Sequence, residues 1–285
     1  MQSHTKRTKE PTLTPKAEEL LRSVLEVPGT CMEAYRAFHR YSFLNQLNVA
    51  YQCNLRGLPI GPIDTYRGWI EKGRQVKREQ KALSMWLPIQ RQGKHQNDVT
   101  NTSMDGEDNG KRWTGFIYKK AWFVVAQTEG DIIPKEVPLP TWSRDTALSN
   151  LGVTLVAFEH ADGNRQGQAM GHSIAINPTA PLQNKTVFHE LAHIVLGHTV
   201  SSHGEDIPRS LMEFEAECVA MLCCASLDIG EVAYSRDYCQ GWMQGEETPE
   251  ASYGKIIATA QIILSAGALE TEEALLPDEP QFALA

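Results

Sequence analysis

The pentapeptide HELAH, which begins at His189, constrains the fold of this chain more than any other part of its sequence. On an α-helix, His189 and His193 lie one turn apart on the same face, so both imidazoles can bind one metal ion. Glu190 is then placed beside the ion, where its carboxylate can accept a proton from water. Apolar neighbours and Gly197 predict a helix over about 184–196. The alternative is an ordinary helix with two hydrogen-bonded histidines and a solvated glutamate.

A metal site with two histidines needs a third protein ligand, and acidic residues follow about twenty positions downstream. A predicted buried helix over about 210–227 carries Glu213, Glu215 and Glu217. Metzincins place their third histidine six residues after the second one, and this chain has Thr199 there. A carboxylate ligand from the downstream helix is therefore expected.

The spacing Glu213-x-x-Ala216-Glu217 resembles the gluzincin pattern. In that pattern the first acid binds the metal, the small residue lets two helices approach, and the second acid orients a ligand histidine. We therefore predict Glu213 as the third ligand and Glu217 as a hydrogen-bond partner of a ligand histidine. Ser210-x-x-Glu213 also fits a capping box, which is a purely structural interpretation of Glu213.

Two imidazoles and one carboxylate leave one coordination position open, which is typical of catalytic rather than structural zinc. We predict one catalytic Zn²⁺, with Mn²⁺ as the alternative ion, and peptide hydrolysis in which Glu190 moves the proton. The segment HSIAINP, residues 172–178, is expected to be an edge strand that pairs with an extended substrate. His198 and His203 are candidates for stabilising the oxyanion, and both also fit surface histidines. Glu215 is expected to be solvated.

Charge divides the chain into halves of opposite sign. Residues 1–140 hold 21 Lys and Arg against 15 Asp and Glu, a net charge of +6, whereas residues 141–285 hold 6 against 20, a net charge of −14. A proline-rich segment at the crossing point predicts an extended linker. We predict an α+β protein with a basic domain over 1–135, a linker over 136–142 and a metal-binding domain over 143–285.

The basic half contains a segment that fits single-stranded nucleic acid. Between Arg67 and Lys94 there are 8 Lys and Arg against 2 Asp and Glu, interleaved with aromatic side chains. Basic side chains follow phosphates and aromatic rings stack on unpaired bases. The alternative is a solvated charged surface beside core tryptophans. The candidate DNA-binding residues are Tyr66, Arg67, Trp69, Lys72, Arg74, Lys77, Arg78, Lys81 and Trp86.

The composition, with 41% hydrophobic and 22% charged residues, is typical of a globular protein and excludes collagen and disulfide scaffolds. No segment approaches the run of about 20 apolar residues that a membrane span needs. The basic N-terminus has no apolar segment behind it, so a cytoplasmic protein without a membrane partner is expected. The six cysteines form no C-x-x-C pair and are expected to be reduced and packed as small hydrophobic side chains.

The order of these motifs resembles the ArdC antirestriction proteins of conjugative plasmids. The resemblance covers about residues 15–266 and rests on RGLPIGPIDTYRGWIEKGRQVKREQKA, WFVVAQTEG, HELAH, the Glu-x-x-Ala-Glu helix, DYCQGWMQ and GKIIATAQIIL. Where the family usually has V-R-K-G-E-K, residues 76–81 of this chain are V-K-R-E-Q-K, so the charges are kept and the glycine is lost.

The resemblance implies a domain that binds single-stranded DNA, joined to a zincin-like metallopeptidase domain of the gluzincin type. It also implies a role in protecting incoming plasmid DNA from host restriction during conjugation, with a restriction-system or regulatory protein as substrate. One alternative is a pure DNA-binding shield with a vestigial or structural metal site, although a structural ion does not require Glu190. A looser resemblance to the ImmA/IrrE peptidases implies a regulatory metallopeptidase whose basic domain binds protein or RNA.

Overall fold

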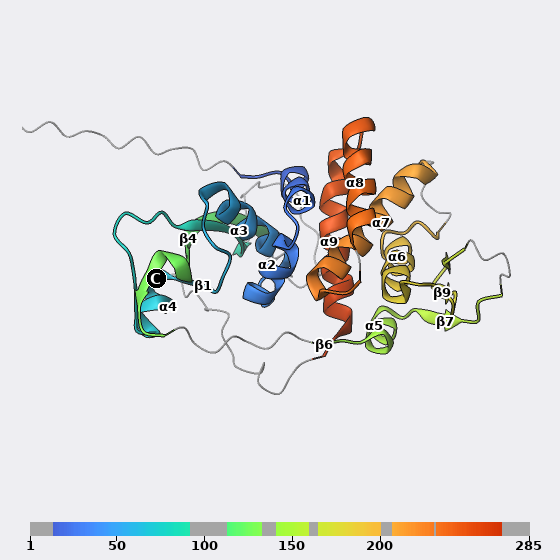
Figure 1. Ribbon diagram of the computed structural model, residues 1–285, viewed down its shortest axis with the longest axis horizontal. Helices are drawn as coiled ribbons and strands as arrows, with labels where there is room; N and C mark the ends of the chain where they lie inside the picture. Colours follow the sequence, from blue (N-terminus) through green and yellow to red (C-terminus); the bar gives the residue numbers. More distant parts are fainter. Residues whose placement is uncertain are drawn as a thin grey trace, which may run out of the picture.

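The computed structural model describes residues 14–91, 113–132, 141–159, 165–200, 207–230 and 232–269, and its helices and small sheets form the predicted α+β fold (Figure 1). The helices are α1 (Ala17–Glu26), α2 (Thr30–Phe38), α3 (Phe43–Arg56), α4 (Tyr66–Glu71), the 3-10 helix η1 (Val125–Gln127), α5 (Arg144–Leu151), α6 (Gln183–Val195), α7 (Arg209–Leu227), α8 (Ala233–Gly245) and α9 (Glu250–Gly267). The strands are β1 (Ile63–Thr65), β2 (Arg74–Val76), β3 (Leu83–Arg91), β4 (Trp113–Val124), β5 (Thr128–Gly130), β6 (Thr141–Trp142), β7 (Thr154–Val156), β8 (Gly167–Met170), β9 (Ser173–Ile176) and β10 (Ala268–Leu269).

The apolar spacing of the sequence predicts a single helix over 31–51, and the structure has two helices there, α2 and α3. Helix α2 ends at Phe38, and Ser42 starts α3 as its N-cap. The backbone of Ser42 is not helical, with φ −55° and ψ 145°, and its Oγ accepts a hydrogen bond from the backbone N–H of Asn45 at 3.4 Å.

The segments ALSMWLPI and GFIYKKAWFVVAQT are rich in residues that favour strands and predict a strand pair. Strands β3 and β4 form that antiparallel pair. The pairing extends from Leu83 opposite Trp122 to Arg91 opposite Trp113, and β1 joins it in a sheet ordered β1-β4-β3. A separate antiparallel pair of β2 and β5 lies beside α4 and carries part of the basic segment.

Polar side chains of α3 hydrogen-bond the edge of β3 that faces away from β4. Asn45 bonds both backbone groups of Trp86, donating to O and accepting from N at 2.9 Å each. Gln52 does the same for Ser84, at 2.8 and 3.0 Å, and Asn48 donates to Ser84 O at 2.7 Å. These amides satisfy buried backbone groups that a further strand would otherwise satisfy, and they fix α3 to the sheet.

The second small sheet has the order β7-β9-β8, with β9 parallel to β7 and antiparallel to β8. The prediction that residues 172–178 provide an edge strand is therefore wrong, because β9 is central. The turn-rich segment before it contains β8, which takes the edge position and contacts α6.

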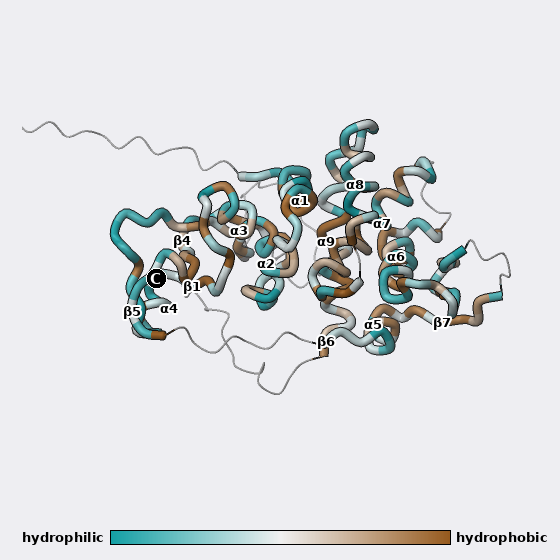
Figure 2. Tube along the Cα trace, in the orientation of Figure 1, coloured by the Kyte–Doolittle hydropathy of each residue, from teal (hydrophilic) through white to brown (hydrophobic). Residues whose placement is uncertain are grey.

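Two hydrophobic clusters share helices α2 and α3. The larger contains apolar residues of α1 and of α5 to α9, and Figure 2 shows hydrophobic residues gathered along α9. The smaller lies between α2, α3 and the sheet of β1, β3 and β4. The shared helices contribute Cys31, Tyr35, Phe43 and Leu47 to the larger cluster, and Ala34, Phe38, Val49, Ala50 and Cys53 to the smaller one.

The first three helices pack directly on the second half of the chain. Helices α1 and α3 contact α9, and α2 contacts α7. Cys31 Sγ lies 3.1 Å from Ser226 Oγ, and Gln240 Nε2 donates to Leu25 O at 2.8 Å. The described residues on either side of the predicted linker therefore share one core. The linker itself lies outside the described residues except for β6, and the division into domains stays a prediction.

All six cysteines are free and buried, as predicted. Among the described residues, no helix is both long and apolar enough to cross a membrane.

Candidate metal centre and nucleic-acid surface

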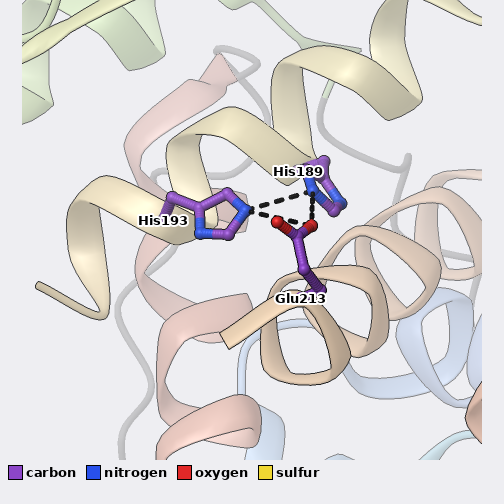
Figure 3. A group of neighbouring side chains, drawn as sticks. All are labelled: His189, His193 and Glu213. Atoms are coloured by element: carbon purple, nitrogen blue, oxygen red, sulfur yellow. Dashed lines mark hydrogen bonds and ion pairs between the residues drawn. The ribbon is translucent and has the colours of Figure 1, made fainter. Parts of the chain in front are cut away.

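The HELAH sequence lies on α6, and α7 packs beside it so that the three predicted ligands converge (Figure 3). The Nε2 atoms of His189 and His193 are 3.1 Å apart. Glu213 Oε2 lies 3.3 Å from the first and 3.7 Å from the second. Within the described part of the chain, these three residues form a group that could hold a metal ion.

The spacing of the three atoms fits a small divalent cation. Ligand atoms at about 2.0–2.1 Å from a tetrahedral zinc ion lie about 3.3–3.4 Å from one another. The observed separations of 3.1, 3.3 and 3.7 Å bracket that value. Imidazole and carboxylate donors also suit Mn²⁺, so the donor set indicates a divalent cation without fixing which one.

The electrostatics of the cluster favour positive charge at its centre. Hydrogen bonds with His189 and His193 hold the pKa of Glu213 well below its usual range. Burial alone lowers the pKa of His189, but hydrogen bonds with Glu213 and Glu217 outweigh burial and raise that pKa to about 9. The carboxylate is thus ionised, and the site attracts a cation.

The capping-box interpretation of Glu213 is wrong. Helix α7 begins at Arg209 with Pro208 as its N-cap and no side-chain cap, so Ser210 lies within the helix. The side chain of Glu213 points to the histidines of α6 (Figure 3).

Glu217 lies where the sequence predicts, beside the second ring nitrogen of a candidate ligand. Its Oε2 is 3.2 Å from His189 Nδ1, and its Oε1 is 2.7 Å from Lys185 Nζ. Burial raises the pKa of Glu217, while hydrogen bonds with His189 and Lys185 outweigh burial and bring the pKa to about 2. A carboxylate at Nδ1 keeps a proton there and leaves the Nε2 lone pair free for a metal.

Glu190 is buried between α6 and β8. A Cβ on Gly167 of β8 would lie 2.7 Å from Glu190 Oε1, so only glycine permits this close approach. Burial raises the pKa of Glu190, and the neighbouring histidines His189 and His193 oppose that rise. A carboxylate beside the candidate ligands can accept a proton from water and return it.

The sequence predicts that Glu215 is solvated and that His198 lies at the surface or stabilises the oxyanion, and these predictions are wrong. Glu215 and His198 are not solvated: their side chains are 3% and 2% exposed, and Glu215 Oε2 lies 2.9 Å from His198 Nε2. The reason is that α7 packs against α2, α6, α8 and α9 and has little solvent-facing surface. Both ring nitrogens of His198 have partners, so it is not available to an oxyanion. His203 lies outside the described residues.

The basic residues of α4, β2 and the following turn form an exposed surface, which we call the basic surface. Lys72 lies 2.6 Å from Asp64 Oδ2, and Arg67 pairs with Glu71 at 2.9 Å, so part of their charge is compensated. The exposed candidate cations are Arg67, Lys72, Lys77, Arg78 and Lys81.

Two of the candidate DNA-binding residues support the fold instead. Trp69 is 1% exposed and donates its Nε1 hydrogen bond to Phe123 O at 2.9 Å, so its ring cannot stack on a base. Arg74 Nε donates to Thr128 Oγ1 at 2.8 Å, and its guanidinium also donates to the carbonyls of Thr128 and Gly130 in β5. Tyr66 is 51% exposed, whereas Trp86 is half-buried with its ring against Tyr118.

The turn after β2 has a backbone conformation that favours glycine, although a glutamate occupies it. Glu79 has a φ of 65°. Left-handed backbone costs an L-residue about 1–2 kcal/mol, so the surrounding structure imposes this geometry. The neighbouring Lys77 and Arg78 remain exposed.

No family model and no curated protein matches the chain. Two solved structures of one protein resemble it. The manganese(II)-bound antirestriction protein ArdC from plasmid R388 is 15% identical, with 90% of this chain and 99% of that chain covered and a TM-score of 0.50. The metal-free structure of that protein is 17% identical, with 88% and 93% covered and a TM-score of 0.49. The likeness extends over nearly the whole chain and shows an ArdC-like fold.

Proposed function

We propose that this chain is an antirestriction protein of the ArdC type that joins single-stranded DNA binding to a metal-dependent peptidase site. The observation that carries the proposal is the convergence of His189, His193 and Glu213, with Glu190 beside them, on an ArdC-like fold. The basic surface and the net charge of the first half support the DNA-binding part.

The residues around the cluster divide the work of peptide hydrolysis. A divalent cation bound there would polarise the scissile carbonyl and lower the pKa of water to about 7. Glu190 accepts the proton of the attacking water and passes it to the leaving amine. The proposed ion is Zn²⁺, with Mn²⁺ as the alternative, and the ArdC structure from R388 contains Mn(II).

The position of β8 supports an extended peptide as the substrate. It is an edge strand, and its Gly167 lies directly over the carboxylate of Glu190. An extended segment that adds to the side of β8 away from β9 would carry its backbone past Glu190. The substrate we propose is a flexible segment of a restriction-system or regulatory protein.

The peptidase part is tested with Glu190→Gln. This change removes the proton acceptor and leaves the three candidate ligands, so zinc content should stay at the parent value while hydrolysis is lost. Zinc is measured by atomic absorption, and cleavage by mass spectrometry of lysates incubated with each variant. Loss of zinc from Glu190→Gln would show that Glu190 is a ligand.

The DNA-binding part is tested on the full chain with a fluorescent oligothymidine. Replacing Lys77, Arg78 and Lys81 by Gln should weaken binding and flatten its salt dependence, since each neutralised phosphate releases about 0.7 counterion from single strands. The control with the same charge change is replacement of Lys16, Arg40 and Lys255 by Gln, which should bind like the parent. Equal affinity of both triple variants would exclude the basic surface.

Plasmid transfer into a restricting host separates the alternatives. A pure DNA shield predicts that Glu190→Gln protects as well as the parent and that the triple variant Lys77, Arg78, Lys81→Gln does not. Coupled function predicts that both variants fail. A regulatory peptidase without a DNA role predicts that only Glu190→Gln fails.

A further inference from the structure

We propose that His198 and Glu215 are positioning residues that hold His193 in the orientation and tautomer required of a metal ligand. This inference rests on the proposed function, because it assigns the metal site a second pair of supporting residues. His193 Nδ1 lies 3.0 Å from His198 Nδ1, and His198 Nε2 lies 2.9 Å from Glu215 Oε2.

The end of α6 brings His198 to His193. Gly197 adopts a φ of 79° and ends the helix, and its N–H donates to Ile194 O at 3.0 Å. The N–H of His198 donates to His193 O at 2.8 Å. This pair of bonds is a Schellman motif, in which the residue after the glycine packs on the residue five positions before it. Here those two residues are His198 and the candidate ligand His193.

The ligand role of His193 determines which ring nitrogens of His193 and His198 carry a proton. Its Nε2 faces the cluster and must offer a lone pair to a cation, so its proton is on Nδ1. That proton is donated to His198 Nδ1, which is then the acceptor. His198 carries its own proton on Nε2 and donates it to the carboxylate of Glu215. Every donor meets one acceptor in this order.

Burial explains why the hydrogen-bonded side chains of His193, His198 and Glu215 depend on one another. The side chains of His198 and Glu215 are 2% and 3% exposed, so water has little access to replace either partner. Loss of one donor to a buried carboxylate is costly, and removal of His198 would leave Glu215 with the hydrogen bond of Ser252 but without that of the imidazole. The two ligand histidines are thus supported differently: His189 by the carboxylate of Glu217 directly, and His193 by Glu215 through an imidazole.

The test compares zinc affinity in the full chain, measured by competition with a chelating indicator. His198→Leu and Glu215→Leu should each weaken zinc binding about 10–100-fold, the effect expected when the partner of a ligand histidine is lost. His198→Gln offers one acceptor and one donor and should restore part of the affinity. Thr199→Val, which removes the neighbouring hydrogen bond to Gly171 O, is the control and should bind zinc like the parent.

A second readout is independent of the metal. In the chelated protein, ¹⁵N NMR of the imidazoles should show the proton of His193 on Nδ1 in the parent and in Thr199→Val, and a mixture of tautomers in His198→Leu. Folded variants with parental zinc affinity and an unchanged His193 tautomer would overturn the positioning role and leave the proposed function intact. Failure of the parent chain to bind zinc or manganese would overturn both.

Discussion

Gly167 shows how one missing methyl group can decide the chemistry of the candidate site. Its hydrogen atom leaves room for the carboxylate of Glu190 beneath β8, where a Cβ would lie 2.7 Å from Oε1. The same position fixes how far the strand stands from α6, since Thr186 Cγ2 would also be 2.7 Å from that Cβ.

We predict that Gly167→Ala reduces peptide cleavage at least tenfold without loss of zinc. The added methyl group must displace either Glu190 or β8, and misplaced proton acceptors forfeit much of the 10²–10⁴-fold gain that such groups supply, as an order of magnitude. Cleavage is followed by mass spectrometry and zinc by atomic absorption. Gln168→Ala, on the next residue of the strand, is the control, and a similar loss of cleavage there would contradict the prediction.

The raised pKa of His189 predicts a pH-dependent stability for the chelated protein. The folded-state pKa is about 9 against 6.5 for the free side chain. The stabilising contribution is therefore fully present below pH 6.5 and is lost as the pH rises through 9. Melting temperature in the presence of a chelator should fall over this range, and His189→Gln should remove that part of the fall. If the melting temperatures of the parent and of His189→Gln fell in parallel as the pH rises, this prediction would be refuted.

The positions of candidate site residues could be predicted from the sequence where they depend only on the geometry of one helix. The period of an α-helix places His189 and His193 together, and the acid twenty residues beyond His193 follows from their need for a third ligand. Burial of Glu215 was not predictable, because it depends on which helices surround α7. His198 had a signal that periodicity does not capture: it directly follows the glycine that ends the helix of His193.

At the scale of elements, α3 is unusual because its buried face toward β3 is polar. Its amide side chains occupy the hydrogen-bonding groups of a strand edge, which couples a helix to a sheet by directional bonds as well as by apolar contact. The sequence NQLNVAYQCN looks like a weakly amphipathic helix, and only the position of β3 explains its asparagines and glutamines.

We predict that Gln52→Leu destabilises the protein by about 1–3 kcal/mol, since it leaves the backbone N–H of Ser84 without its partner. Leu55→Gln, on the same helix at a 69% exposed position, is the control and should change stability by less than about 0.5 kcal/mol. Urea denaturation of both variants measures the difference. A neutral Gln52→Leu would show that water or another side chain satisfies the strand edge.

The elements themselves were largely predictable, and their connections were not. Apolar patterns located α6 and α7, and strand-favouring residue types located the paired strands β3 and β4, because each of these segments is long and regular. It missed β8, whose four residues lie among glycines and glutamines, and consequently misjudged which strand is the edge. Short strands are specified by the sheet that accepts them rather than by their own sequence.

At the scale of the whole molecule, the charge boundary and the packing boundary do not coincide. The net charge changes sign near residue 140, yet α1, α2 and α3 bury apolar side chains against α7, α8 and α9. Net charge determines what each surface attracts or repels, whereas packing determines which segments fold together. The net charge can be counted from the sequence, and the packing cannot.

We predict that residues 141–285 expressed alone do not fold cooperatively. The fragment lacks Leu20, Leu21, Leu25, Phe43 and Leu47, each fully buried in the larger cluster of the complete chain. Burial of such side chains stabilises by about 1.5–3 kcal/mol each, and five of them equal the whole stability of a typical domain. A broad thermal transition with strong dye binding to exposed apolar surface is expected. A sharp melt of the fragment would contradict the prediction.

Because α2 and α3 belong to both hydrophobic clusters, neither half of the gene encodes a complete core. A gene segment that encoded only the acidic part would leave its product without three of the helices on which it folds, and one that stopped before residue 141 would carry those helices with an uncovered apolar side. The basic surface and the metal cluster are in that sense one heritable unit, whatever each of them binds.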